Sequence, residues 1–429
     1  MTTQGKIKFK EIEKFLGNLE QCTKCGACAF WCPVYQEEVV ESSVARGKNM
    51  IIRGLVSGEL RYTKELADRL NKCTLCMTCT ANCPVKARVP DVIIAARADT
   101  VVARNLKFSY NIVYRWLLPH RRLFGNVVRV ASWFQRFFLP RTEGTIRHLS
   151  LFLSALGKGR QIPEIAPRFL RQMVAVDNRP PAGVATKLKA GYFTGCMTNF
   201  VFPNLGNHII DFLTTNGVEV VLPEEQGCCG APVFLGSGDF ETGRKLADSN
   251  VKAFEGLDYI ITSCATCASA MKEYSKFLPD NPQRREAYAK FINKIKDVSE
   301  FLVDVMKLPA SAYKASPEVL GKKVTWHDPC HLSRHLEIKE QPRQIIKSIS
   351  GIEYVEMPDA DRCCGMAGTF SIYYYDLSKK IASKKIRSIQ STGADIVVTS
   401  CPGCMIQLID GIIRNKMKVK VMHIMELLA

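Results

Sequence analysis

The cysteines are the residues of this sequence best suited to chemistry. There are 18 of them among 429 residues. Eight fall in two runs near the N-terminus, each of the form C-x2-C-x2-C-x3-C-P and ending in Pro33 and Pro84. This spacing lets thiolates from one loop surround a cubane 4Fe–4S cluster. Two runs with the same spacing favour two such clusters over structural zinc or coincidence.

The fourth cysteine of each run is expected to serve the other cluster. The proline that follows it turns the chain away, and in two-cluster ferredoxins this cysteine ligates the neighbouring cluster. One predicted ligand set is therefore Cys22, Cys25, Cys28 and Cys83, and the other is Cys73, Cys76, Cys79 and Cys32.

The other ten cysteines form a duplicated set, in which corresponding members lie 134 to 137 residues apart. The first copy is Cys196, Cys228, Cys229, Cys264 and Cys267, and the second is Cys330, Cys363, Cys364, Cys401 and Cys404. Five thiolates exceed the four ligands of a tetrahedral zinc ion. Each copy is therefore expected to hold a cluster with several iron atoms, or a zinc ion with one cysteine spare. Every cysteine of the chain then belongs to a metal-ligand pattern.

The elements that must position this duplicated set alternate between strand and helix. In the first copy we expect strands over 188–194, 218–222 and 259–262 and helices over 203–215, 239–254 and 267–277. In the second we expect strands over 324–327, 353–357 and 396–399 and helices over 342–350, 375–390 and 403–413. Such alternation predicts two small parallel sheets. The lone cysteine and the C-x2-C pair each follow a strand, at the sheet edge where ligand sites gather.

The chain is therefore predicted to be an α+β multidomain protein. Amphipathic patterns over 42–57, 63–72 and 91–103, the last with Asp91 as N-cap, indicate a helical ferredoxin domain. The predicted divisions are 1–105 for this domain with two 4Fe–4S clusters, 106–185 for a basic aromatic connector, 186–312 for the first cysteine-rich α/β domain and 313–429 for the second.

The connector carries most of the excess charge. Residues 101–190 hold 16 Lys and Arg against three acids, within a whole-chain net charge of +18. Short basic helices with aromatic faces can lie flat on a bilayer. We expect residues 106–150 to contact an anionic membrane surface or a membrane subunit through Arg115, Arg121, Arg122 and Arg129; packing against a partner protein or its own domain is the alternative. No nucleic-acid module is recognisable.

The N-terminus lacks the apolar region of a secretory signal, and no stretch is apolar enough for a spanning helix. We therefore expect a cytoplasmic protein, peripheral on the inner face of the cell membrane. Neither a dinucleotide fingerprint nor a P-loop occurs, so no organic redox cofactor is expected.

The duplicated pattern resembles the cysteine-rich CCG domain of heterodisulfide reductase subunits. Here 31 and 32 residues separate the lone cysteine from the CCG pair, and 34 and 36 separate that pair from C-x2-C. With the N-terminal runs, the chain resembles the iron–sulfur subunits of glycolate oxidase, lactate-utilisation and anaerobic glycerol-3-phosphate dehydrogenase complexes. It equally resembles the D-type heterodisulfide reductase subunit.

This resemblance implies a non-cubane 4Fe–4S cluster in one or both CCG domains, with zinc possible in the first. It implies an electron-transfer subunit that links a flavoprotein dehydrogenase to a membrane quinone or a cytochrome-type membrane subunit. The alternative function is a heterodisulfide or thiol–disulfide reductase, with His331, next to Cys330, as the candidate proton donor. An apolar-mouthed pocket beside Cys330 would favour that alternative. A zinc-stabilised scaffold is a third interpretation, and His327 and His335 are expected to be ordinary hydrogen-bonding or surface residues.

Overall fold

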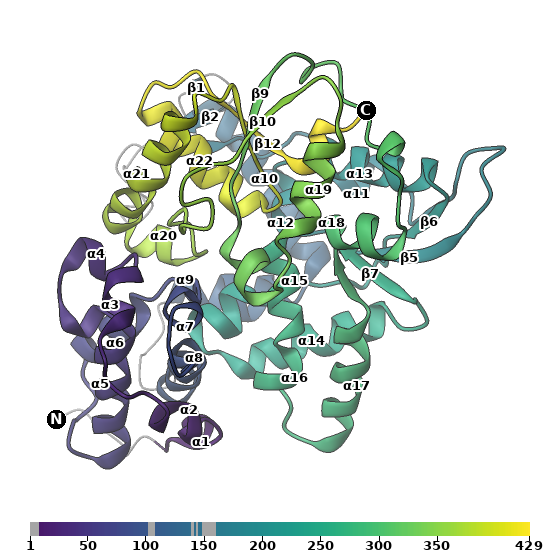
Figure 1. Cartoon of the computed structure of the whole chain (residues 1–429). Coiled ribbons are helices and arrows are strands. Elements are labelled where there is room, and N and C mark those ends of the chain that lie inside the picture. The colour runs from purple at the N-terminus through teal and green to yellow at the C-terminus, as the bar shows by residue number, and fades with distance from the viewer. Residues whose placement is uncertain (1–7, 102–107, 139–140, 143–144, 148–159) are drawn as a thin grey trace.

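The computed structural model describes residues 8–101, 108–138, 141–142, 145–147 and 160–429. Its N-terminal helices form one body, and two α/β units stand beside it, as Figure 1 shows from purple through teal to yellow. The predicted combination of a helical first part and two small parallel sheets is confirmed.

The N-terminal body consists of helices, and two of the loops between them carry the cysteine runs. Its elements are α1 (Lys10–Glu13), α2 (Leu16–Glu20), α3 (Ala27–Trp31), α4 (Tyr35–Glu38), η1 (Glu41–Ser43), α5 (Ala45–Ser57), α6 (Lys64–Asn71), α7 (Thr78–Ala81) and α8 (Val89–Thr100). The expected N-cap role of Asp91 is wrong, because α8 begins two residues earlier with Pro90 in its first turn. The Asp91 side chain is instead buried and binds Arg88 at 2.6 Å and Lys276.

The two α/β units repeat one strand order. In the first, parallel strands β6 (Val218–Val221), β5 (Leu188–Tyr192), β7 (Tyr259–Thr262) and β8 (Ile295–Asp297) lie side by side, with β4 (Asp177–Asn178) antiparallel at the edge. In the second, the parallel order is β10 (Glu353–Val355), β9 (Lys323–Trp326), β11 (Ile396–Thr399) and β12 (Lys420–His423). Strands β8 and β12 were not expected from the sequence.

Helices cover these sheets. The first unit has α12 (Cys196–Phe200), α13 (Pro203–Thr215), η3 (Ala231–Leu235), α14 (Phe240–Ala253), α15 (Ala265–Lys272), α16 (Tyr274–Phe277), α17 (Pro282–Asn293), α18 (Val298–Glu300), η4 (Phe301–Val305) and η5 (Ala310–Ala312). The second has η6 (His331–His335), α19 (Glu340–Ser348), α20 (Phe370–Tyr373), α21 (Tyr375–Thr392), α22 (Pro402–Arg414) and η7 (Ile424–Leu427).

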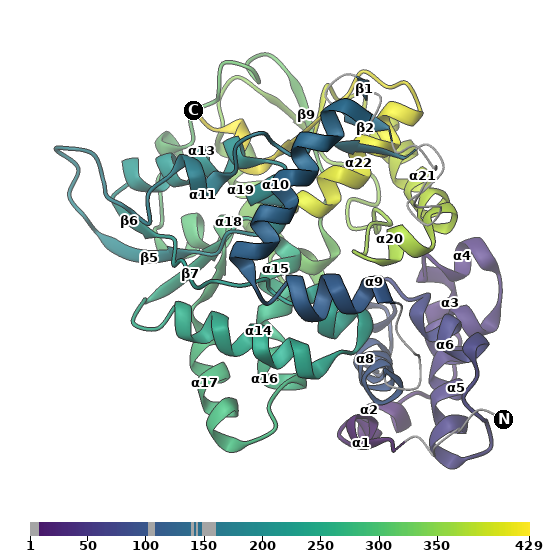
Figure 2. The ribbon, with the colours of Figure 1, turned by 180° about the vertical axis from the view of Figure 1, so that it is seen from behind.

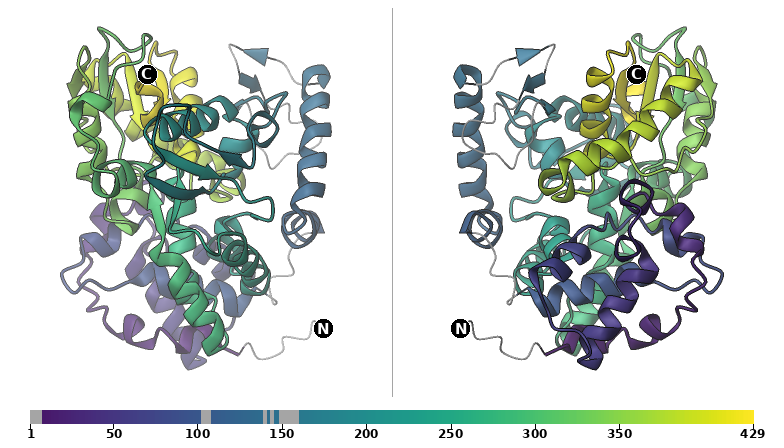
Figure 3. Two further views of the ribbon diagram at one scale, coloured as in Figure 1. Left: turned by 90° about the vertical axis from the view of Figure 1, so that its right-hand side faces the viewer. Right: turned by 90° about the vertical axis from the view of Figure 1, so that its left-hand side faces the viewer.

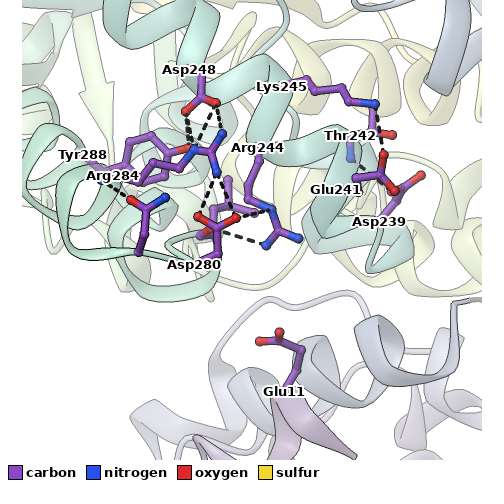
Figure 4. A network of polar contacts seen from close by, with 12 residues as sticks. Glu11, Asp239, Glu241, Thr242, Arg244, Lys245, Asp248, Asp280, Arg284 and Tyr288 are labelled. Carbon is purple, nitrogen blue, oxygen red and sulfur yellow. Dashed lines mark hydrogen bonds and ion pairs between the residues drawn. The ribbon is translucent and has the colours of Figure 1, made fainter. Parts of the chain in front are cut away.

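Helix α17 is an addition of the first unit, and polar contacts fix it to α14. Arg284 binds Asp248 at 2.9 Å and Asp280 at 2.8 Å, and the Tyr288 hydroxyl donates to Asp248 at 2.7 Å (Figure 4).

The connector runs along the outside of both units. It contains α9 (Phe108–Tyr110), η2 (Asn111–Leu117), α10 (Arg121–Phe138), the small antiparallel sheet of β1 (Arg141–Thr142), β2 (Thr145–Arg147) and β3 (Gln161–Pro163), and α11 (Leu170–Met173). Helix α10 crosses the back of the molecule in Figure 2 and stands at its outer edge in Figure 3. None of the described helices is long and apolar enough to cross a bilayer.

Candidate metal centres

The two N-terminal runs fold into matching loops. Lys24 and Gly26 have positive φ in the first, as Leu75 and Met77 do in the second. Both loops therefore have the same reversed turns, even though only Gly26 lacks a side chain that resists this conformation.

Each loop borders one small cavity, and the cavities are lined by the sulfurs that the sequence pairs. One is lined by Cys22, Cys25, Cys28 and Cys83, the other by Cys32, Cys73 and Cys76, and Cys79 borders both. The fourth cysteine of each run therefore lines the cavity of the other run. The full ligand assignment stays a prediction.

All ten cysteines of the duplicated set line one larger cavity of about 780 Å³. In both units the lone cysteine and the C-x2-C pair follow the carboxyl ends of β5, β7, β9 and β11, as expected. The CCG pairs approach from loops that turn at Gly230 and Gly365, whose φ values are +76° and +88°. The cavity is also bordered by Cys73, Tyr62 and Tyr110, and its walls are mostly apolar.

Sulfurs from different parts of the chain meet around this cavity. Within the second unit, the Sγ atoms of Cys364 and Cys404 lie 3.5 Å apart. Between the units, Cys264 and Cys401 line the same cavity, and the Thr266 hydroxyl of the first unit lies 3.4 Å from the Cys401 sulfur. The thiol of Cys76, from the second N-terminal run, interacts with that of Cys363.

Asn250 and Arg121 lie beside the first site. The Asn250 side chain accepts from the Gly227 amide at 2.8 Å and donates to the Cys228 carbonyl at 2.9 Å. Arg121 of the connector is half-buried near Cys196 and Cys228 and donates to the Gln226 carbonyl. Burial lowers the pKa of the Arg121 guanidinium to about 10, with these two thiols opposing the shift.

Two histidines of η6 join the second site to its neighbours. His331 Nδ1 is 2.6 Å from the Ser269 hydroxyl of the first unit, and His335 Nε2 is 2.9 Å from the Leu75 carbonyl of the N-terminal loop. Their rings stack with centroids 4.4 Å apart. His331 lines the large cavity, and burial lowers the pKa of its imidazole. Its role as a proton donor stays a prediction.

A lysine and a third histidine lie behind the second site. Lys385 is fully buried and donates to the carbonyls of Asp359 at 2.6 Å and Ala360 at 3.0 Å. Its position in α21 corresponds to that of Asn250 in α14, at the same offset as the two CCG pairs. Burial lowers the pKa of Lys385 to about 8.

His327 is fully buried as well, with a ring nitrogen and the sulfurs of Cys364 and Cys404 all within 4.8 Å of one another. Of the three histidines around Cys330, the sequence singled out His331 and not this one.

Closely spaced buried thiols suit a metal. Burial raises the pKa of Cys32 to about 12 and that of Cys79 well above its ordinary value. Thiolates at such positions need a nearby cation, which an iron cluster or zinc ion supplies when it binds. The residues of all four sites therefore fit such groups.

The comparisons with known proteins agree with these sites. The model of the cysteine-rich CCG domain matches twice, at residues 190–272 and 324–409. The model of the 4Fe-4S dicluster domain matches residues 18–87.

Among curated proteins, the chain is similar to the "Probable glycolate oxidase iron-sulfur subunit" of Bacillus subtilis, with 31% identity over 100% of this chain and 98% of that protein. It is 31% identical to "Lactate utilization protein A" of Halalkalibacterium halodurans over 56% of this chain and 96% of that one. It is 32% identical to "Lactate utilization protein A" of Bacillus cytotoxicus over 56% of this chain and 98% of that one. The chain, in which a 4Fe–4S dicluster domain precedes two CCG domains, belongs to the family of the glycolate oxidase iron–sulfur subunit.

Proposed function

We propose that this chain is the electron-carrying subunit of a complex that oxidises a 2-hydroxy acid such as glycolate or lactate. A flavoprotein dehydrogenase is its electron donor, and a membrane quinone or membrane subunit is its acceptor. The observation that carries this proposal is the unbroken series of cysteine sites through the protein, in a chain related over its whole length to a glycolate oxidase iron–sulfur subunit.

The donor sets favour cubane 4Fe–4S clusters in the dicluster domain, and the family resemblance implies a non-cubane 4Fe–4S cluster in one or both CCG domains. Such clusters, when bound, take up and release single electrons. Each CCG site keeps all five cysteines, so a missing ligand does not favour zinc in the first.

The contacts between sites suggest an order of electron flow. Cys76 interacts with Cys363, which links the dicluster domain to the second CCG site. The Cys401 sulfur lies 3.4 Å from the Thr266 hydroxyl, which links the second CCG site to the first. The first site in turn lies under the connector, because Leu118 packs with Val233 and Leu246 beside Cys228. We therefore place the flavoprotein at the dicluster end, where Cys25 is exposed, and the acceptor at the connector.

Part of the exposed side of the connector helix α10 is apolar, and this supports a lipid-facing role. Its polar residues Ser132 and Gln135 are buried against the carbonyl of Ile165. Its exposed side carries Val127, Val130 at 56% exposure and Trp133 at 58%, and Trp116 of the preceding helix is 55% exposed. An apolar face turned outward, with arginines beside it, suits the boundary of a bilayer with anionic headgroups.

The charges that reach this surface are fewer than the sequence suggested. Arg115 binds the buried Asp239 at 2.7 Å, and Arg121 is half-buried near the first site. Both were expected to contact the membrane, but their partners lie on the first CCG unit instead. Arg122 also pairs with Glu224 of that unit, at 3.5 Å, but it stays exposed, as Arg129 does.

Liposome flotation tests the membrane contact. Trp116→Ala with Val130→Asp is expected to abolish binding to vesicles that contain phosphatidylglycerol, because it removes apolar area and adds a repelled charge. Arg122→Gln with Arg129→Gln is expected to weaken binding only at low salt, because salt screens exposed charges. A matched control, Phe30→Ala, alters an aromatic side chain on the dicluster domain that is 73% exposed and should bind as the wild type does. Unchanged binding by the first variant would reject the contact.

One observation favours a second candidate, a disulfide reductase. The cavity beside Cys330, Cys363 and Cys364 is continuous, with mostly apolar walls and Tyr374 and Phe370 at its border. There a disulfide would take two electrons and two protons to give two thiols, and His331 lies on the cavity wall.

Anaerobic stopped-flow spectroscopy distinguishes the two functions. The complex is isolated from native membranes and mixed with glycolate, lactate or a small-molecule disulfide. Bleaching of the iron–sulfur absorbance by a hydroxy acid, through a co-purified flavoprotein, supports the first function. Reoxidation of the dithionite-reduced chain by the disulfide, with two thiols formed, supports the second and rejects the first if no hydroxy acid reduces the clusters.

A further inference from the structure

His327 is a buried side chain whose polar atoms lack partners. It directly follows β9 and is fully buried, and its backbone amide donates to the Val398 carbonyl at 2.8 Å. Neither ring nitrogen has a hydrogen-bond partner among the described residues. A buried polar group without a partner is costly, so one is expected to form when the site is complete.

Two cysteine sulfurs and one backbone carbonyl lie close to the ring. A ring nitrogen lies within 4.8 Å of the sulfurs of both Cys364 and Cys404. The carbonyl of Ala360 also interacts with the ring, but without hydrogen-bond geometry, and it already accepts the Asp328 amide at 3.0 Å. A neutral imidazole carries a single N–H, and because the Ala360 carbonyl does not accept it, that N–H is free to bind a cysteine sulfur.

The position of the ring separates a hydrogen bond from direct ligation. Cys364 and Cys404 line the large cavity, but His327 does not. The ring therefore reaches the two sulfurs from behind the cavity wall, where it can contact the cysteines rather than a metal atom inside.

We propose that His327 donates an N–H hydrogen bond to the sulfur of Cys364 or Cys404 and thereby raises the reduction potential of the second CCG site above that of the first. A hydrogen bond to a ligand sulfur stabilises its negative charge, which is greatest in the reduced state of the site. His327 acts here as a positioning and tuning residue, and the inference rests on the proposed function.

The first CCG site has no such donor at the matching position. Phe193 occupies that place three residues before its lone cysteine, and its amide donates to Ile261 as that of His327 does to Val398. The Phe193 ring is buried and stacks on Phe254 with centroids 5.9 Å apart. The two sites therefore differ in one hydrogen bond to sulfur.

Redox titration of the full chain, followed by electron paramagnetic resonance, tests this proposal. His327→Phe is expected to lower the potential of the second site by about 59 mV, a tenfold change in its one-electron equilibrium. His327→Gln, which keeps an N–H donor, is expected to retain part of that potential. The matched control Phe193→Leu should leave the first site unchanged. In the wild type, a proton coupled to the second site should exchange in D₂O.

Several results would overturn the inference. These are an unchanged potential in His327→Phe with full iron content, no exchangeable proton coupled to the wild-type site, a nitrogen coupling large enough for direct ligation, or zinc at the second site. Iron analysis separates the inference from the proposed function. If all sites lack iron, both fail, whereas clusters that carry electrons at unchanged potentials contradict only the role of His327.

Discussion

The two CCG units hold the same five sulfurs in different surroundings. Around the first site the matching positions are Phe193, Met197 and Asn250, and around the second they are His327, His331 and Lys385. The second site therefore has two ring donors and an ammonium group where the first has apolar side chains and a neutral amide.

Their neighbours differ as well. The second site touches the dicluster domain through Cys76 and His335, whereas the first lies beneath the connector through Arg121. Duplication thus preserved the ligands of the sites and changed what lies around them. We infer that electrons pass through the two CCG sites one after the other and that the sites are not equivalent. Three pairs of substitutions test this.

The largest effect is expected from removing one CCG pair at a time. On the proposed order, Cys363→Ser with Cys364→Ser should isolate the first site from the dicluster domain, because the second site is the one that interacts with Cys76. Cys228→Ser with Cys229→Ser should leave the second site in contact with it. In reduced samples the two clusters of the dicluster domain should still broaden each other's signals, and the additional broadening caused by the CCG sites should be lost only in the first variant. An equal loss of broadening in both variants would contradict the proposed order of the sites. The iron content of the unchanged sites in each variant controls for folding.

A smaller effect is expected from the two CCG glycines. A Cβ at Gly365 would lie 2.7 Å from the backbone oxygen of Ser378, whereas one at Gly230 would lie 3.2 Å from a side-chain atom, in the ring of Phe234. Both residues have positive φ, which costs a side chain about 1–2 kcal/mol. Gly365→Ala should therefore lose most second-site iron, and Gly230→Ala should keep most first-site iron. The reverse pattern in anaerobic iron analysis would show that the two loops are placed differently.

The smallest effect is expected from the residues that hold these loops. Lys385→Met removes a positive charge near Cys364 and should lower the second-site potential by a few tens of millivolts. Asn250→Leu removes no charge and should leave the first-site potential nearly unchanged, although it removes bonds to Gly227 and Cys228. Potentials measured under the conditions of the His327 experiment give the comparison, and equal shifts would argue against a role for charge.

The sequence predicted the frame of these sites well. Cysteine spacing and alternating strands placed Cys264 and Cys401 at strand ends, because a parallel sheet gathers its carboxyl ends at one edge. The helix over 203–215 and the strands at 259–262 and 396–399 have the predicted bounds. Short strands such as β8, Ile295–Asp297, carry too few residues for a periodic signal, and they were missed.

What surrounds the sulfurs could not be predicted in the same way. In the sequence, Arg115 and Arg121 look like residues of an exposed surface. Only the packing of the connector against the first CCG unit pairs Arg115 with Asp239 and partly buries Arg121. His327 looked ordinary because one sequence does not show which side chain turns toward a distant cysteine. Aligning the two repeats places it opposite Phe193, and that difference was the available signal.

The most direct test of the account is the metal content of the full chain, purified without oxygen. If all eighteen cysteines serve four 4Fe–4S sites, iron and labile sulfide should each reach about 16 per chain, with signals from reduced clusters. Colourless protein that gives no signal after dithionite, and that either holds zinc or titrates 18 free thiols, would contradict it.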